Sequence, residues 1–268
     1  MKLHKAAIKN YFLIVYVSLT MLSHTFSFAA QHNLRFVINS PGSSPYIYYD
    51  IEHARYRGVV VDFFNSFHEA DKFNVEYIDS SRSRNEHFVY TEQADLFFGS
   101  SVWVSNPNHF IYSDPLMPHT SFLYSKSKFK EPFVFDSYKP ASICTRRGFS
   151  YPNLQPDFET QKLTRVDSIS QTTMALMLGK GRCDFAYMSQ ENAWAIMSGP
   201  EFCEYTFYQS PKAISFVNLE FVMGKRLIRE KAKINEQIAI FVNSGALNIS
   251  IRKHLKPSIF PKQTCEKK

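Results

Sequence analysis

The residues best suited to chemistry in this chain are small hydrogen-bonding side chains that follow a short apolar run. Gly99-Ser100-Ser101 ends the run that begins at Asp95, and Trp103 and Asn106 come next. Hydroxyl and amide groups donate and accept hydrogen bonds without carrying charge, which suits them to holding a small molecule. The run is too short for a helix and has the composition of a buried strand. Because open α/β proteins bind ligands at the carboxyl edge of their strands, the sequence predicts a binding site here.

The sequence contains none of the common catalytic or metal motifs. GxSxG, HExxH and the P-loop do not occur, the nine His are dispersed, and the four Cys form no CxxC pair. Gly179-Lys180-Gly181 lies between an expected helix and an expected strand, which is the reverse of a dinucleotide-binding fingerprint. We therefore expect no catalytic residue, no metal site and no cofactor.

Alternating strands and helices are needed to position such an edge. Apolar alternation predicts strands over 34–39, 73–78 and 95–98, separated by helical patterns after Gly58 and over 83–93. A second series follows, with strands over 141–145, 164–166 and 185–188 and a helix over 170–180. Strands over 120–125 and 218–223 and helices over 233–241 and up to residue 255 complete the pattern. This order is typical of parallel sheets covered by helices on both faces.

Residues 1–30 have the features of a secretory signal peptide. Three Lys precede an apolar stretch over 11–22, and Ser27 and Ala29 are small residues at the −3 and −1 positions of a cleavage site. The stretch falls short of the ~20 residues that a membrane-spanning helix needs. Since no Cys follows this stretch at the expected cleavage site, we expect a periplasmic protein without a lipid anchor.

Charge and cysteine content fit an exported globular protein. The net charge is +7, and removal of residues 1–30 leaves 28 basic and 24 acidic residues, or +4, without a basic run that would suit nucleic acid. All four Cys lie in the second half of the chain, where export permits disulfides. One or two bridges among Cys144, Cys183, Cys203 and Cys265 are expected, and their pairing stays open.

Several motifs resemble those of periplasmic solute-binding proteins of the amino-acid-binding type, bacterial extracellular solute-binding protein family 3. The motifs that carry the resemblance are Pro45-Tyr46, Gly58 with Asp62, Gly99 with Ser101, Tyr112-Ser113-Asp114-Pro115, Gly181-Arg182-Cys183-Asp184 and Ser244-Gly245. They occur in the order of that family and extend from Leu34 to Leu255. Proteins of this type are two-lobed receptors that deliver small molecules to ABC transporters.

The resemblance implies an α/β, two-lobed fold of the type II periplasmic-binding-protein kind. Two parallel-rich sheets flanked by helices would be joined by a double-crossover hinge. We expect residues 31–124 and 216–268 to form lobe 1 and residues 125–215 to form lobe 2, after a signal peptide over 1–30. Asp62 is expected to be structural.

The resemblance also implies a set of ligand-binding residues. They are Tyr46, Ser101, Trp103, Asn106, Arg147, Gly148, Ser150 and Ser189. Asn106 stands where the family has the Arg that binds an α-carboxylate, and Ser189 stands where it has the Asp that binds an ammonium group. The ligand is therefore expected to be a small polar or aromatic molecule other than a standard α-amino acid, with Arg146 or Arg147 as a displaced positive group. Trp103 either stacks on the ligand or fills its space.

The implied function is binding rather than catalysis. A monomer would close over its ligand and present it to a membrane ABC permease or a membrane sensor. Two alternatives remain open. The first alternative is a sensory or interaction protein that kept the fold and lost the pocket. The second is a periplasmic dehydratase with Glu191 and His109 as candidate acid and base.

Overall fold

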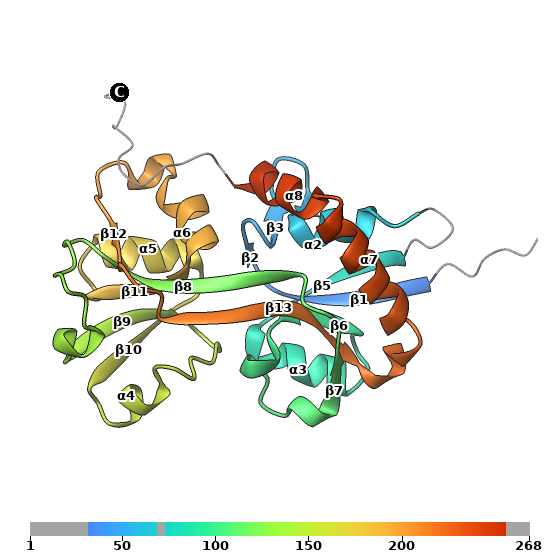
Figure 1. Ribbon diagram of the computed structural model, residues 1–268, viewed down its shortest axis with the longest axis horizontal. Coiled ribbons are helices and arrows are strands. Elements are labelled where there is room, and N and C mark those ends of the chain that lie inside the picture. The colour runs from blue at the N-terminus through green and yellow to red at the C-terminus, as the bar shows by residue number, and fades with distance from the viewer. Residues whose placement is uncertain (1–31, 69–72, 256–268) are drawn as a thin grey trace, which may run out of the picture. The chain divides into compact units, whose positions relative to one another are not determined.

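The computed structural model describes residues 32–68 and 73–255, which Figure 1 shows as two groups of strands and helices joined by two long strands. The expected signal peptide and Cys265 lie outside the described residues. Within these ranges, no helix is long and apolar enough to cross a membrane.

One group of elements, lobe 1, is a parallel sheet with helices on both faces. It contains β1 (His32–Asn39), β5 (Phe73–Ser80), β6 (Leu96–Gly99), α2 (Val59–Asn65), α3 (Arg82–Tyr90), α7 (Lys231–Asn243) and α8 (Ala246–His254). Strand β1 lies between β5 and β6 and runs parallel to both. Leu34, Phe36 and Ile38 belong to the same buried cluster as residues of α2, α7 and α8, whereas Val37 belongs to a second cluster with Val89 of α3. This alternation is the period of two expected for a strand buried on both faces.

The other group, lobe 2, repeats the arrangement. It contains β9 (Ala141–Arg146), β10 (Leu163–Ser168), β11 (Phe185–Ser189), α4 (Gln155–Glu159), α5 (Gln171–Gly179) and α6 (Gln190–Met197). Strand β9 pairs in parallel with both β10 and β11. Cys144 and Ala186 pack with α5 and α6, while Ile143 and Phe185 pack on the opposite face. A disulfide joins Cys144 to Cys183, and none of the described cysteines is free.

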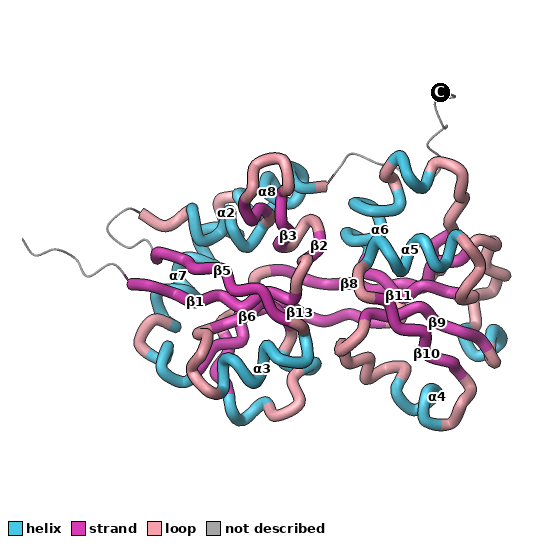
Figure 2. Tube along the Cα trace, turned by 180° about the vertical axis from the view of Figure 1, so that it is seen from behind, coloured by secondary structure: helices cyan, strands magenta, loops and turns pink. Residues whose placement is uncertain are grey.

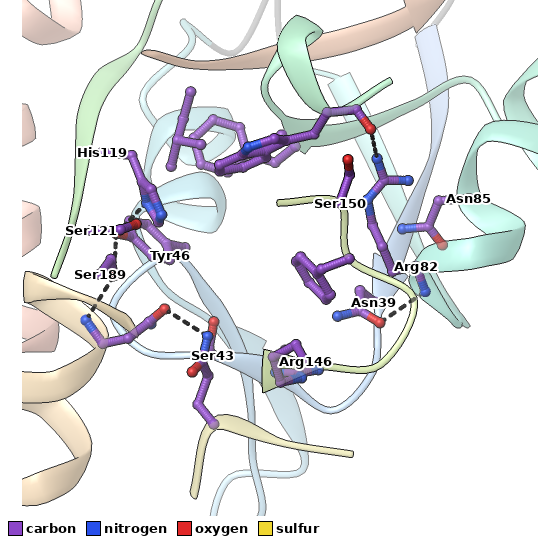
Figure 3. Close-up of a pocket in the computed structure, with 18 of the residues that line it drawn as sticks. Asn39, Ser43, Tyr46, Arg82, Asn85, His119, Ser121, Arg146, Ser150 and Ser189 are labelled. Atoms are coloured by element: carbon purple, nitrogen blue, oxygen red, sulfur yellow. Dashed lines mark hydrogen bonds between the residues drawn. The ribbon is translucent and has the colours of Figure 1, made fainter. Parts of the chain in front are cut away.

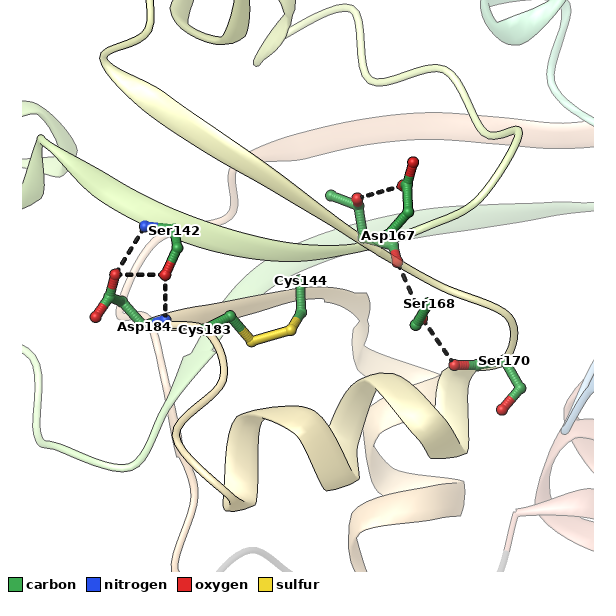
Figure 4. The surroundings of a disulfide bond; sticks show 8 residues. Ser142, Cys144, Asp167, Ser168, Ser170, Cys183 and Asp184 are labelled. Carbon is green, nitrogen blue, oxygen red and sulfur yellow. Dashed lines mark hydrogen bonds between the residues drawn. A yellow bond between two sulfur atoms is a disulfide. The ribbon is translucent and has the colours of Figure 1, made fainter.

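An aspartate ties neighbouring strands together in the same way in both lobes. In lobe 1, Oδ2 of Asp95 accepts a hydrogen bond from the backbone N–H of Arg35 at 2.7 Å, and the Asp95 N–H donates to the Arg35 carbonyl at 2.8 Å. In lobe 2, Oδ2 of Asp184 accepts from the Ser142 N–H at 2.7 Å (Figure 4), and the Asp184 N–H donates to the Ser142 carbonyl at 3.0 Å. These ties explain why an Asp precedes each apolar run in the sequence.

Two long antiparallel strands connect the lobes. They are β8 (Met117–Ser125) and β13 (Ser215–Gly224), which Figure 2 shows from behind. They pair with one another from Met117 opposite Leu219 to Ser121 opposite Ser215. Beyond this segment β8 pairs with β11 of lobe 2, and β13 pairs with β6 of lobe 1. The two expected sheets are therefore linked into one hydrogen-bonded path, β10-β9-β11-β8-β13-β6-β1-β5, because the crossing strands pair with each other as well as with their own lobes.

Shorter elements complete the described chain. They are β2 (Gly42–Ser43), β3 (Ile47–Asp50), β4 (Arg55–Arg57), β7 (Phe110–Tyr112), β12 (Tyr208–Gln209), and 3-10 turns at Ser101–Trp103, Pro107–His109, Phe135–Tyr138, Pro200–Phe202 and Lys225–Ile228. The predicted lobe boundaries fall at the end of β8 and the beginning of β13, and they stay a prediction.

Candidate functional site

A cavity of about 140 Å³ is lined by residues of both lobes and of the crossing strands. Lobe 1 contributes the ends of β1 and β6 and the first turn of α3, and lobe 2 contributes the ends of β9 and β11 and the first residue of α5. Figure 3 shows Tyr46, His119, Ser121 and Ser189 grouped together, with Arg82, Asn85 and Asn39 in a second group. The cavity thus lies where carboxyl ends of parallel strands from both lobes meet, as open α/β sheets favour.

Helix α2 holds Tyr46 in place through its first turn. The Val59 N–H donates to the Pro45 carbonyl at 2.9 Å, and the Val60 N–H donates to the Tyr46 carbonyl at 3.0 Å, so two N–H groups at the helix start are satisfied. Gly58 precedes the helix with φ +127°, and a Cβ there would meet the Tyr46 carbonyl oxygen at 2.4 Å. Only glycine fits this close approach, which explains its place in the motif.

The hydroxyl of Tyr46 connects three parts of the chain. It lies 2.9 Å from Nδ1 of His119 on β8, 3.1 Å from Oγ of Ser189 at the end of β11, and 3.0 Å from Oε2 of Glu191, to which it donates. A phenol carries one proton, so Nδ1 of His119 donates to the Tyr46 oxygen when Glu191 accepts that proton. Ser189 is also the N-cap of α6, because its Oγ accepts from the Asn192 N–H at 3.1 Å.

Burial disfavours the charged forms of the side chains in this cluster. Burial raises the pKa of Tyr46 well above its usual value, and the negative charge of Glu191 adds to the effect. Burial likewise lowers the pKa of His119 to about 4 and raises the pKa of Glu191. His119 is therefore neutral at physiological pH and adds no positive charge to the cavity.

Arg146 is a buried cation without a carboxylate partner among the described residues. It ends β9, its residue is 3 % exposed, and its Nε has no hydrogen-bond partner in the part of the chain that the structure describes. Its guanidinium lies over the Phe149 ring at 5.2 Å from the centroid, and burial lowers its pKa. An Arg stays protonated in proteins, so this side chain brings one uncompensated positive charge to the cavity wall.

Arg82, the second arginine of the wall, already has partners. Its guanidinium contacts Oε1 of Glu86 at 2.9 Å and donates to the Trp103 carbonyl at 2.9 Å. Its backbone N–H donates to Oδ1 of Asn39 at 2.9 Å, which fixes the beginning of α3 against the end of β1. Arg82 therefore organises the wall and leaves Arg146 as the cation that lacks a counter-charge.

Two side-chain oxygens of the wall also lack partners. They are Oδ1 of Asn85 and Oε1 of Gln171. Asn192 donates through Nδ2 to the Ser44 carbonyl at 2.6 Å, so its Oδ1 is left to accept from Nε2 of Gln171 at 3.3 Å. This chain of bonds fixes the Gln171 amide with its oxygen as a free acceptor.

Four of the eight residues expected to bind ligand line the cavity, and four do not. Tyr46, Trp103, Ser150 and Ser189 line it. Ser101, Asn106, Arg147 and Gly148 are not part of its lining. The Ser101 N–H donates to Glu220, Asn106 and Arg147 are exposed, and a Cβ at Gly148 would lie 3.4 Å from the Ser83 nitrogen of lobe 1. No ligand is present, so ligand contact by any of the eight stays a prediction.

The histidine near the cavity is His119 and not His109. The His109 ring stacks on Tyr90 with centroids 4.4 Å apart, and it does not line the cavity. Glu191 does not line it either, because its carboxylate faces the Tyr46 hydroxyl. Asn85 and Gln171 line the cavity, although the sequence analysis predicted no role for them. Their position could have indicated one, since both lie in the first turn of a helix that follows a parallel strand.

Comparison with known proteins identifies the fold. No protein-family model and no curated protein sequence matches the chain. A binding component of an ABC transporter from Wolinella succinogenes, in complex with lysine, has a TM-score of 0.71 at 14 % identity, covering 84 % of this chain and 97 % of its own. The GluR0 ligand-binding core with L-glutamate has a TM-score of 0.69 at 14 % identity, covering 85 % and 100 %.

A third solved structure is a histidine kinase sensor domain similar to periplasmic binding proteins. Its TM-score is 0.68 at 14 % identity, covering 85 % of this chain and 98 % of its own. These similarities, together with the two lobes and their double crossing, show that the chain has the type II periplasmic-binding-protein fold predicted from the sequence.

Proposed function

We propose that this protein is an exported solute-binding protein whose lobes close over a small ligand in the cavity. The observation that carries the proposal is a cavity lined by both lobes, where the lining residues Asn85, Arg146 and Gln171 each have a buried polar side-chain atom without a partner among the described residues. Buried polar atoms without partners destabilise a folded protein, and a ligand that satisfies them would be bound. A ligand that contacts both lobes stabilises the closed state, which a membrane ABC permease or sensor then recognises.

Two positions at which this chain differs from the family's motifs support a ligand other than a standard α-amino acid. Asn106, at the position of the expected carboxylate-binding Arg, is exposed and outside the wall. Ser189 caps α6 and contacts Tyr46, so it supplies no carboxylate for an ammonium group. The aromatic rings of Trp103 and Phe149 in the wall are suited to packing against the carbon skeleton of a ligand.

One observation favours a second candidate function. The Tyr46 hydroxyl and the Asn192 amide join the lobes directly, at 3.1 Å to Ser189 and 2.6 Å to Ser44. A chain closed by its own side chains would suit an interaction protein that reports to a membrane sensor without binding a small molecule.

A thermal-shift screen of metabolites on the purified mature chain tests the proposal. A ligand raises the melting temperature in a concentration-dependent way, because it binds the folded state alone. Ser150, an exposed residue of the wall, allows a matched test: Ser150→Trp fills the cavity and is expected to remove the shift, whereas Ser127→Trp on the exposed surface retains it. A shift that survives Ser150→Trp, or no shift with any compound, contradicts the proposal.

A further inference from the structure

The charged residues that line the cavity, among those the structure describes, are both arginines, and the nearby carboxylates of Glu86 and Glu191 face Arg82 and Tyr46. The cavity wall includes Arg82 and Arg146 but no Asp or Glu, and His119 is neutral. Arg82 is paired with Glu86, which leaves the charge of Arg146 without compensation among the described residues. A cationic ligand would enter a positive environment without a counter-ion, whereas an anion would neutralise a buried charge.

The geometry of Arg146 suits an anion with two oxygens. A guanidinium presents its donors in a planar fork that matches a carboxylate, and Nε is one of the donors along one edge of that fork. Nε of Arg146 is buried without a partner among the described residues, and the residue is 3 % exposed. The guanidinium carbon lies over the Phe149 ring at 5.2 Å from its centroid, a contact that restricts the orientation of the guanidinium.

Two acceptor oxygens of the wall would be satisfied by a hydrogen-bond donor on the ligand. Oε1 of Gln171 is fixed as an acceptor by the bonds through Asn192 to Ser44, and Oδ1 of Asn85 is a second acceptor without a partner. A hydroxyl satisfies such an oxygen without bringing charge. A carboxylate cannot, since it has no proton to donate.

The volume limits the size of the ligand. The cavity holds about 140 Å³. A cavity of about 150 Å³ accommodates benzene, which corresponds to roughly six to eight non-hydrogen atoms. Short-chain acids fall in this range.

From these features we infer that the ligand is a small hydroxylated carboxylate, with its anionic group on Arg146 and its hydroxyl on Gln171 or Asn85. The inference rests on the proposed function, because it takes the cavity as the binding site. It differs from the amino-acid arrangement in placing the cation on lobe 2 and in having no site for an ammonium group.

Calorimetric titration of the mature chain with matched probes tests the ligand class. The probes are glycolate, lactate and glycerate, their amides, and glycine, alanine and serine, so that members of a set differ in charge and donor type. We expect binding by at least one hydroxy acid, and at least about tenfold weaker binding by its amide and its amino acid. Equal binding of acid and amide, or stronger binding of the amino acid, overturns the inference.

Substitution of Arg146 tests the assigned residue. Arg146→Gln is expected to weaken hydroxy-acid binding by about tenfold to a hundredfold and to abolish the preference for acid over amide. The free variant is expected to melt at the same or a higher temperature, because an unpaired buried charge is removed; a purely structural role would lower it. Arg84→Gln changes an exposed arginine outside the wall and is the matched control.

Further outcomes distinguish failure of the hydroxy-acid inference from failure of the proposed solute-binding function. If Arg146→Gln fails to fold, Arg146→Lys carries the test: it keeps the preference for the acid and loses affinity, and unchanged affinity overturns the assignment. Binding of neutral compounds alone, removed by Ser150→Trp, overturns the anion inference and supports the solute-binding function. No binding of any probe or metabolite overturns both.

Discussion

The hydroxyl of Tyr46 is a single group that contacts β8, the end of β11 and the first turn of α6. Since Tyr46 belongs to lobe 1 and Ser189 and Glu191 to lobe 2, these bonds hold the lobes together. Ser189 stands at the position of the expected ammonium-binding Asp, and its Oγ contacts the Tyr46 hydroxyl and caps α6.

Tyr46→Phe is expected to weaken the contact between lobes and to lower the free energy of unfolding by about 1–3 kcal/mol. The substitution keeps the ring and leaves the buried groups of His119, Ser189 and Glu191 without their partner. Urea unfolding measures the effect, and Tyr49→Phe, at a side chain that is 45 % exposed, is the control. Equal stability of both variants would mean that the Tyr46 bonds contribute nothing.

At the residue scale the sequence predicted part of the wall for a clear reason. Tyr46, Trp103, Ser150 and Ser189, which line the cavity, were predicted because the resemblance places them at positions that bind ligand in the family. The predicted ligand-binding set contains Arg147, whereas Arg146 lines the cavity. The reason is that β9 extends one residue beyond its predicted end. Adjacent residues of a strand point to opposite sides, so an error of one residue reverses the assignment.

At the scale of elements, a side-chain cluster fixes α8 against α2. Oδ2 of Asp62 accepts from Ser250 Oγ at 2.8 Å and lies 3.0 Å from Nε2 of His254, and both of its oxygens lie 3.1 Å from Nζ of Lys253. Burial alone would raise the pKa of Asp62, but these hydrogen bonds outweigh it and lower that pKa to about 2. The prediction that Asp62 has a structural role agrees with these contacts.

Asp62→Asn is expected to lower the free energy of unfolding by about 1–3 kcal/mol at neutral pH. Since the folded-state pKa is about 2 and the usual value is 3.8, the stabilisation is fully present above pH 3.8 and is lost as the pH falls toward 2. The difference in denaturant midpoint between wild type and variant should therefore shrink over that range. A constant difference from neutral to acidic pH would contradict the assignment.

The order of elements was predictable, whereas several lengths and short elements were not. Strong alternation and helical periodicity identified β1, β5, β6, α5, α7 and the aspartates before β6 and β11. The crossing strands β8 and β13 are longer than predicted, because partners far away in sequence extend the ladder at both ends. The sheet β2-β3-β4 and the short helix α4 lack enough residues to show a period.

At the scale of the whole molecule, the proposed closure would depend on β8 and β13. A lobe motion would bend or twist this pair, since the hydrogen-bonded path continues through it. Hinge motions of this kind change the distance between the lobes without unfolding either one.

Spin labels at Asn108→Cys in lobe 1 and Thr160→Cys after α4 in lobe 2 measure the motion. Both positions are exposed, and the described chain has no free cysteine to compete for label. Pulsed electron–electron double resonance is expected to show two populations of molecules, one with a long and one with a short distance between the labels. Addition of ligand is expected to increase the population with the short distance. Adding Tyr46→Phe should increase the population with the long distance in the free protein. One distance that neither ligand nor substitution changes would exclude closure.

The depth of Arg146 has a consequence for the surroundings in which the protein works. Dissolved salt at roughly 0.1–0.15 M weakens the interaction of exposed charges that lie more than about 8–10 Å apart. Salt ions penetrate little into a buried site, so a buried charge is screened much less. A receptor that recognised anions at its surface would lose affinity in brackish or saline media. If the ligand is an anion bound by Arg146, which is 3 % exposed, its affinity should therefore change little with the ionic strength of the medium.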